Sequence, residues 1–280
     1  MKTWTTLIDA EALAGQLGAA DLRLFDCRFA LNDDAIGEAA WSEAHLPGAQ
    51  YAHLGRDLSG PHRPGAGRHP WPEAAAFAAW LGRSGVTPET QVVAYDGGDG
   101  AYAARLWWLL RTLGHDGVAV LDGGWARWTA LGLPTTPEVP VVAAADYRGA
   151  FDSGQLFDAA EIPVRLAAGD LLLDARAAER YRGEVEPIDR VAGHVPGAVN
   201  RPYAANLHEG RFKPAEQLAQ EFSALLGDRA PQQTIAMCGS GVTACHHLLA
   251  MAHAGLPGAR LFTGSWSGWI EDPARPVETV

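Results

Sequence analysis

Residues 234–244 read Thr-Ile-Ala-Met-Cys-Gly-Ser-Gly-Val-Thr-Ala, a short apolar run that ends in a cysteine, then a loop with two glycines, then the start of an apolar stretch. A similar stretch lies in the first half of the chain, where Val92–Tyr95 is followed by Asp-Gly-Gly-Asp-Gly-Ala. Cys238 therefore stands where the earlier copy has Asp96. An apolar strand that leads through a glycine loop into a helix is typical of α/β proteins.

Three other motifs recur in the same order in both halves of the chain. In the first half and then the second they are Asp-x-Arg at 26–28 and 174–176, His-x-Pro-Gly-Ala at 45–49 and 194–198, and Trp-x-x-Trp at 125–128 and 266–269. Ordered matches of this kind indicate an internal duplication. The sequence therefore predicts two similar domains.

The apolar runs and helical patterns also follow the same order in both halves. The predicted strands are 22–26, 91–95, 118–121, 170–174, 234–237 and 260–262, and the predicted helices are 73–81, 101–113, 215–226 and 242–254. Short apolar strands that alternate with helices indicate a mainly parallel sheet flanked by helices. In such sheets ligands bind at the carboxyl ends of the strands, which is where Cys238 and Asp96 lie.

A proline-rich stretch separates the two halves. Pro134, Pro137 and Pro140 cannot continue a helix, so this stretch is predicted to be a linker. We expect an N-terminal domain at 1–133, the linker at 134–145 and a C-terminal domain at 146–280.

Composition excludes several classes of function. The formal net charge of −11 leaves no basic surplus for binding nucleic acid or an anionic membrane. The longest uncharged window, 231–259, is interrupted throughout by polar residues and proline, so no membrane helix is predicted. The N-terminal sequence has no apolar signal segment, and the 3 cysteines form no CxxC pair. These features favour a cytoplasmic protein with reduced thiols and no metal site.

Cys238 is the strongest candidate for chemistry. Gly239 and Gly241 allow a tight turn in which successive amides can point at the sulfur, and the positive end of the following helix is directed at the same place. Both effects favour the thiolate, the nucleophilic form of cysteine. The simpler interpretation, a small buried residue, is the one we expect for Cys27 and Cys245.

Two other cysteine chemistries fit the residues less well. A cysteine phosphatase needs an arginine six positions after the cysteine to bind phosphate, and Ala244 stands there. A cysteine hydrolase needs a histidine beside the sulfur. His246 and His247 are close in sequence, but they lie on the predicted helix and need not face Cys238.

The sequence resembles the two-domain rhodanese family of sulfurtransferases, from the first Asp-x-Arg motif to Trp269. The resemblance rests on both His-x-Pro-Gly-Ala motifs and on the loop Cys238-Gly-Ser-Gly-Val-Thr243. In that family the first domain is catalytically silent and the second carries the cysteine, which matches Asp96 and Cys238. The neutral loop is similar to the 3-mercaptopyruvate sulfurtransferase branch, whereas thiosulfate-specific members carry a basic pair inside it.

The resemblance implies roles for particular residues. Arg180 would bind the donor carboxylate with a second arginine, for which Arg190 is the nearest candidate, although it lies closer to the second motif histidine than the family pattern expects. Ser240 would donate a hydrogen bond to the donor, in an arrangement whose histidine and aspartate match His45 and Asp34. Histidines of this motif can equally order the turn before a strand, an alternative that the sequence leaves open. Backbone amides of the loop would also bind the donor, at Gly239, Gly241, Val242 and Thr243.

The resemblance further implies a reaction. The Cys238 thiolate would take a sulfur from 3-mercaptopyruvate, release pyruvate, and pass the persulfide sulfur to a small thiol, to cyanide or to a thioredoxin-like protein, without a metal or organic cofactor. A neutral loop fits this donor, because mercaptopyruvate carries its one carboxylate several bonds from its thiol, whereas thiosulfate is a dianion. A thiosulfate sulfurtransferase and a non-catalytic persulfide carrier remain open alternatives.

Overall fold

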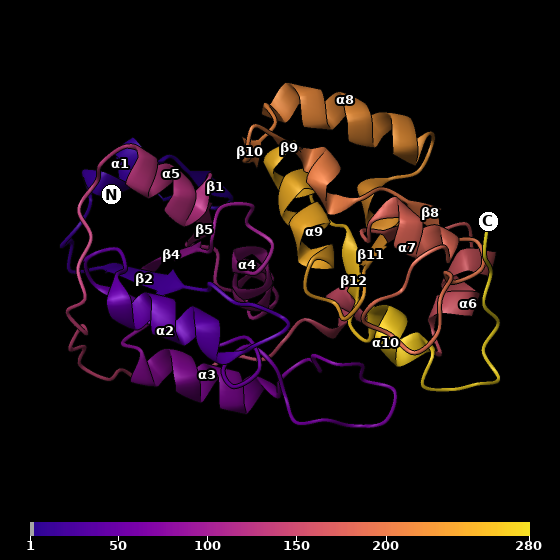
Figure 1. Cartoon of the computed structure of the whole chain (residues 1–280), viewed down its shortest axis with the longest axis horizontal. Coiled ribbons are helices and arrows are strands. Elements are labelled where there is room, and N and C mark those ends of the chain that lie inside the picture. The colour runs from indigo at the N-terminus through magenta and orange to yellow at the C-terminus, as the bar shows by residue number, and fades with distance from the viewer. Residues whose placement is uncertain (1–2) are drawn as a thin grey trace. The chain divides into compact units, whose positions relative to one another are not determined.

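The computed structural model describes residues 3–280, and these divide into two compact units that each contain a five-stranded sheet (Figure 1). The first unit comprises the chain up to Gly60 together with Pro72–Asp152 and Glu209–Phe212. The second unit comprises Pro61–Trp71, Ser153–His208 and Lys213–Val280. Within the described residues, no helix is both long enough and apolar enough to cross a bilayer.

The first unit has a parallel sheet with strand order β1-β5-β4-β2-β3. The strands are β1 (Leu7–Ile8), β2 (Leu22–Asp26), β3 (Ala49–Tyr51), β4 (Gln91–Tyr95) and β5 (Val118–Leu121). The helices are α1 (Ala10–Ala14), α2 (Ala35–Glu43), α3 (Ala74–Arg83), α4 (Ala103–Thr112) and α5 (Gly124–Ala130). Leu24 packs with α1 and α5 in one core, whereas Phe25 on the opposite face contacts Trp80 of α3 with ring centroids 5.1 Å apart.

The second unit repeats this order as β6-β12-β11-β7-β8, again parallel. Its strands are β6 (Leu156–Phe157), β7 (Leu171–Asp174), β8 (Val199–Asn200), β11 (Thr234–Met237) and β12 (Arg260–Phe262), with β9 (Leu207–His208) outside the sheet. The helices are α6 (Ile162–Ala167), α7 (Ala178–Arg182), α8 (Ala215–Leu226), α9 (Ala244–His253) and α10 (Ser265–Trp269). Short 3₁₀ turns lie at Ser153–Gln155, Tyr203–Asn206 and Pro231–Gln233, and the two-residue strand β10 (Arg211–Phe212) lies in the first unit.

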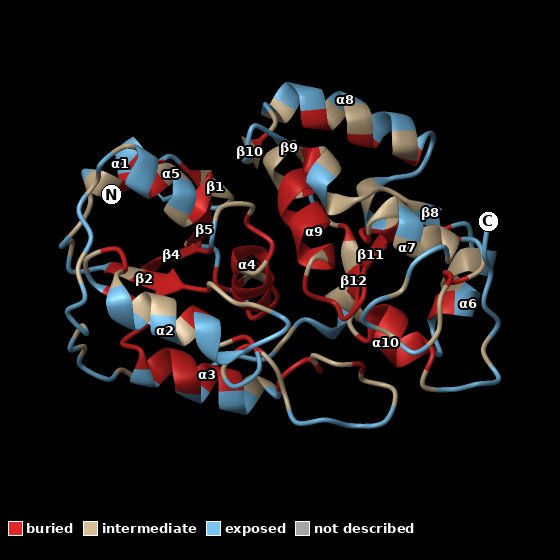
Figure 2. Ribbon diagram, viewed as in Figure 1, coloured by how far each residue is buried: buried red, intermediate tan, exposed pale blue. Residues whose placement is uncertain are grey.

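The predicted α/β fold with two parallel sheets is confirmed. Strands β2, β4, β5, β11 and β12 have the predicted bounds, and the four predicted helices correspond to α3, α4, α8 and α9 with ends shifted by at most two residues. Figure 2 shows burial concentrated in the central strands and in α4 and α9, whose residues are buried on nearly every side. The stretch expected as linker, 134–145, has no helix, and it lies within Pro72–Asp152 of the first unit.

The three repeated motifs contact one another in each unit, which explains why they recur together. In the second unit Arg176 forms an ion pair of 2.6 Å with Asp174, donates to the carbonyl of Gly193 at 2.8 Å, and stacks over Trp266 at 4.7 Å. In the first unit Arg28 makes the matching contacts with Asp26, the carbonyl of Ala44 and Trp125. In each unit the arginine of Asp-x-Arg thus links the end of a strand to the residue before His-x-Pro-Gly-Ala and to the first tryptophan of Trp-x-x-Trp.

Candidate active site

Cys238 directly follows β11, and the start of α10 fixes its backbone. Its amide donates to Oγ of Ser265 at 3.0 Å, and its carbonyl accepts from the amide of Trp266 at 3.0 Å. Ser265 has a φ of 49°, in the left-handed region that non-glycine residues rarely adopt. Cys238 is 1% exposed. The thiol therefore has a defined position with little access to bulk solvent.

We expect loop amides to converge on the sulfur of Cys238, and this stays a prediction. The matching loop of the first unit does show converging amides, around the carboxylate of Asp96. That carboxylate accepts hydrogen bonds of 2.9 to 3.1 Å from the amides of Gly98, Gly100, Tyr102 and Ala103. The loop of this fold can therefore enclose an anion.

Ser240 contacts His69, a histidine that lies outside the repeated motifs of the sequence. Nδ1 of His69 lies 2.8 Å from Oγ of Ser240. His69 belongs to the segment Pro61–Trp71, which is part of the second unit although it precedes β4 in the sequence. An imidazole beside a hydroxyl can exchange a proton with it. The Ser240–His69 pair therefore places a group that can accept or donate a proton at the uncharged cysteine loop.

His45 and Asp34, which we expected to accompany Ser240, lie in the first unit, and His45 is engaged there. Nδ1 of His45 lies 2.7 Å from the carbonyl of Trp41, and Nε2 lies 3.1 Å from the carbonyl of Glu138. Asp34 is exposed directly before α2. These contacts are the ones expected for the alternative left open by the sequence, in which His45 orders the turn before a strand.

Arg180 is held at the cysteine loop by two buried carboxylates. It donates to Glu186 at 2.7 to 3.2 Å and to Asp189 at 3.1 Å. The side chains of Glu186 and Asp189 are 3% and 4% exposed, whereas that of Arg180 is 15% exposed. Both terminal nitrogens of Arg180 lie 3.6 Å from the point where a β-carbon on Gly239 would stand. The guanidinium therefore borders the backbone next to Cys238.

Arg190, the expected second arginine, does not join Arg180. Its Nη2 donates to the carbonyls of Ile270 and Glu271, just after α10. Sequence proximity to Arg180 was the reason for naming Arg190, but the turn that brings Asp189 toward Arg180 directs Arg190 elsewhere.

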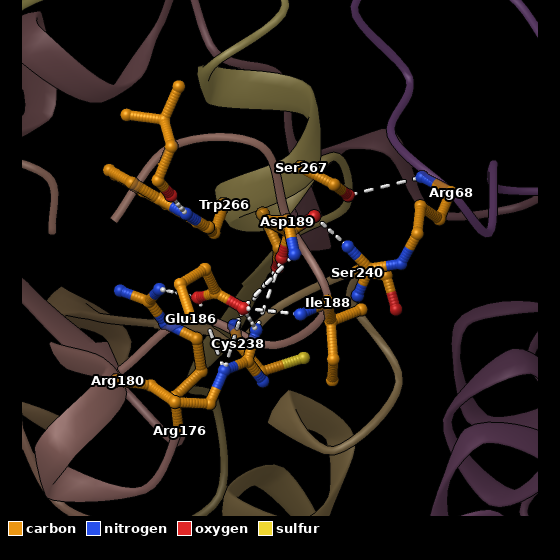
Figure 3. A network of polar contacts seen from close by, with 12 residues as sticks. Arg68, Arg176, Arg180, Glu186, Ile188, Asp189, Cys238, Ser240, Trp266 and Ser267 are labelled. Atoms are coloured by element: carbon orange, nitrogen blue, oxygen red, sulfur yellow. Dashed lines mark hydrogen bonds and ion pairs between the residues drawn. The ribbon is translucent and has the colours of Figure 1, made fainter. Parts of the chain in front are cut away.

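A different arginine borders the cysteine loop. Arg68 forms an ion pair with Asp189, and its Nη2 lies 3.0 Å from the β-carbon position of Gly239. Burial lowers the pKa of the Arg68 guanidinium below its usual value, and the neighbouring Cys238 opposes that shift. Figure 3 shows Arg68, Asp189 and Arg180 in one network of polar contacts beside Cys238.

The other two cysteines have the structural environments that we expected for them. Cys27 is 1% exposed, and burial raises the pKa of its thiol well above the ordinary value, with further help from Asp26. The Cys245 thiol donates to the carbonyl of Gly241 at 3.4 Å within the core. Neither environment favours the thiolate.

The two histidines of α9 form a buried network with Asn206. Nδ2 of Asn206 lies 3.0 Å from Nδ1 of His246 and 2.9 Å from Nδ1 of His247, and Nε2 of His247 lies 2.7 Å from the carbonyl of Arg201. An amide group that donates to both rings needs both Nδ1 atoms unprotonated. This network gives His247 a structural role and leaves the cysteine hydrolase interpretation without support.

Arg68 and His69 were not predicted as site residues, because the segment Pro61–Trp71 has no helical or strand periodicity. One signal was available. In a chain with a net charge of −11, the stretch 60–72 contains no acidic residue and carries His62, Arg63, Arg68 and His69. Long loops without secondary structure of their own are often functional, so a basic loop in an acidic protein pointed to an anion-binding role.

Comparison with known proteins gives consistent matches over nearly the whole chain. The Rhodanese-like domain matches residues 9–131 and 158–272. A "probable 3-mercaptopyruvate sulfurtransferase" of Pseudomonas aeruginosa is 52% identical over 277 residues, which is 98% of either chain. The thiosulfate sulfurtransferase of Gallus gallus is 35% identical over 92% of this chain and 89% of its own length. Among solved structures, the 3-mercaptopyruvate sulfurtransferase SseA of Escherichia coli has a TM-score of 0.81 at 29% identity, covering 94% of this chain and 100% of SseA.

Proposed function

This chain belongs to the rhodanese-like family of sulfurtransferases, and on that premise we propose that it transfers sulfur from 3-mercaptopyruvate to a thiol or to cyanide through a persulfide on Cys238. One observation carries the choice of donor. The cysteine loop has no charged residue, whereas the guanidinium of Arg180 borders it at Gly239. A single carboxylate several bonds from the reacting sulfur matches a cation placed beside the loop rather than in it.

The first half-reaction is a nucleophilic displacement at the donor sulfur. The Cys238 thiolate attacks that sulfur, a sulfur–sulfur bond forms, and the carbon–sulfur bond breaks with its electron pair passing to pyruvate as the enolate. The proton of the donor thiol ends on the former methylene carbon, which gives pyruvate and a persulfide anion. Ser240 with His69 at 2.8 Å is suited to carry that proton. In the second half-reaction an acceptor thiolate or cyanide removes the outer sulfur.

Asp96 supports the persulfide by analogy within the chain. A carboxylate oxygen of aspartate and the outer sulfur of a cysteine persulfide are both two bonds from the β-carbon. In the first unit the loop amides donate to those oxygens at 2.9 to 3.1 Å. The amides of the cysteine loop would likewise be able to donate to the outer sulfur. Hydrogen bonds that form only as negative charge develops on the outer sulfur stabilise the transition state more than the ground state, and this difference lowers the reaction barrier.

Replacing the nucleophile tests this function directly. Cys238→Ser should reduce pyruvate release from 3-mercaptopyruvate to the uncatalysed background, because a serine hydroxyl neither ionises nor accepts sulfur under the same conditions. The matched control is Cys245→Ala, which removes a buried thiol of the same unit and should retain turnover. Pyruvate release by Cys238→Ser at nearly the rate of the unaltered chain would contradict the proposal.

Thiosulfate is a second candidate donor, because Arg68 and Arg180 together place two guanidinium groups beside Gly239. Two cations favour a dianion. The ratio of kcat/KM for the two donors decides between them, and we expect 3-mercaptopyruvate to be preferred. A protein that is loaded once and never turns over would instead be a persulfide carrier, and repeated pyruvate release in the presence of a thiol would exclude that role.

A further inference from the structure

The segment Pro61–Trp71 is fixed on the second unit around α10. The carboxylate of Glu271 accepts from the amides of Gly65 and Gly67, and the amide of Arg68 donates to Oγ of Ser267 at 3.1 Å. These three hydrogen bonds leave the backbone at Arg68 little freedom. The side chain of Arg68 therefore starts from a defined position.

Gly67 shows how closely the segment approaches α10. Its φ is +75°, and a β-carbon there would lie 2.5 Å from the carbonyl oxygen of Gly264 and 2.7 Å from Oγ of Ser267. Any other residue would be strained and would collide with backbone. The approach thus depends on glycine directly before Arg68.

One carboxylate joins Arg68 to Arg180. Oδ1 of Asp189 pairs with Nη1 of Arg68, and Oδ2 of Asp189 accepts from Nη2 of Arg180 at 3.1 Å. The side chain of Asp189 is 4% exposed and paired at both oxygens, so the carboxylate has a fixed position. With Asp189 engaged on one side, Nη2 of Arg68 and Nη1 of Arg180 have no hydrogen-bond partner among residues 3–280.

The two unused nitrogens meet at the same point. Nη2 of Arg68 lies 3.0 Å and Nη1 of Arg180 lies 3.6 Å from the β-carbon position of Gly239. Gly239 has no side chain to fill this space, and it directly follows Cys238. The side chains of Arg68 and Arg180 are 29% and 15% exposed, so a small anion can reach them.

We propose that Arg68 binds the donor carboxylate together with Arg180, and that Asp189 positions the two guanidinium groups for it. This inference rests on the proposed function and extends it by naming a donor-binding residue from the first half of the sequence. A carboxylate has two oxygens, and two guanidinium groups that converge on one point can each donate to one of them. The space beside Gly239 keeps the bound carboxylate next to the nucleophile.

Two donors that differ only in the carboxylate test the assignment. 3-Mercaptopyruvate carries the carboxylate, and mercaptoacetone has a methyl group in its place with the same thiol and carbonyl. Arg68→Ala should lower kcat/KM for 3-mercaptopyruvate by about 10- to 150-fold, the range for loss of a hydrogen bond to a charged group. With mercaptoacetone the same variant should stay within about twofold of the unaltered chain.

Arg182→Ala is the matched control, because Arg182 lies on α7 close to Arg180 and pairs with the exposed Glu184. It should change kcat/KM for either donor by no more than about twofold. Arg68→Lys keeps the charge without the planar fork and should show a smaller loss that is again confined to 3-mercaptopyruvate. Thermal unfolding of each variant shows whether it is folded, and Arg68→Lys decides the question if Arg68→Ala does not fold.

The outcomes separate this inference from the function on which it rests. Equal losses with both donors, or no loss with 3-mercaptopyruvate, would overturn the role of Arg68 while leaving the proposed function intact. An unaltered chain that releases no pyruvate from 3-mercaptopyruvate would overturn both.

Discussion

At the scale of single residues, the setting of Cys238 depends on side chains brought from distant parts of the sequence. Arg68, Arg180 and the pair of Ser240 with His69 all lie at its loop. Fixed cations and a proton carrier beside a nucleophile stabilise charge as it develops in a reaction.

The sequence predicted part of this site, and the roles of its residues stay predictions. Ser240 and Arg180 could be named because their motifs lie beside Cys238 or match a family pattern. Arg190 and His45 were named from the family pattern, and the structure places Arg190 on carbonyls after α10 and His45 in a turn of the first unit. The position of a residue in a sequence motif does not determine the direction of its side chain in an irregular loop.

Replacing His69 tests the proton-transfer role. His69→Gln should lower kcat for pyruvate release by about 10²- to 10⁴-fold, the range for loss of a general acid or base, and should flatten the dependence of kcat on pH. Steady-state measurement across the pH range checks both effects.

His45→Gln is the comparison for that variant. Because His45 is buried and bonded to two carbonyls, the change should lower thermal stability and leave the pH profile of kcat unaltered. If His45→Gln flattened the profile and His69→Gln did not, the assignment of the Ser240 partner would be wrong.

At the scale of elements, the five-residue helix α10 organises the site. Its start binds the backbone of Cys238, its Ser267 amide donates to the carbonyl of Gly239 at 2.8 Å, and the Ser267 hydroxyl accepts from the amide of Arg68. The sequence could not predict α10, because five residues are too few for a helical period. The central strands and longer helices were predictable because each buries an apolar pattern of sufficient length.

Helix α9 gives the chain a dependence of stability on pH. Burial lowers the pKa of His247 to about 3, whereas an unfolded histidine has a pKa of about 6.5. Between these values the unfolded chain binds the additional proton, so the free energy of unfolding falls as the pH drops from about 6.5 toward about 3. Urea unfolding at pH 7 and pH 5 should show a loss of about 2 kcal/mol from this residue.

His247→Gln should remove that part of the dependence. A glutamine can accept from Asn206 and donate to the carbonyl of Arg201, but it does not titrate. The same decrease between pH 7 and pH 5 in both proteins would show that His247 does not cause it.

At the scale of the whole molecule, the chain contains two copies of one fold, and a chemically important difference lies at the end of the central strand. Both sheets have the same strand order, and both units tie Asp-x-Arg to a tryptophan in the same way. The copies differ where the central strand ends, with Asp96 in one and Cys238 in the other. The duplication could be predicted because its motifs recur in order.

The assignment of segments to units could not be predicted. Pro61–Trp71 belongs to the second unit and Glu209–Phe212 to the first. The first of these segments is fixed by single contacts such as Gly67 with Gly264 and Arg68 with Asp189. Contacts between residues so far apart in the sequence leave no periodic pattern. A domain boundary predicted from composition alone therefore cannot assign these two segments to the correct unit.

Mass spectrometry of the intact chain after brief exposure to 3-mercaptopyruvate, without an acceptor, tests the central claim most directly. We expect the mass of one added sulfur, and fragmentation should place it on the peptide that contains Cys238. Addition of a thiol or cyanide should remove it. An unmodified Cys238 in a protein that nevertheless releases pyruvate, or a sulfur found on Cys27 or Cys245 instead, would contradict the account.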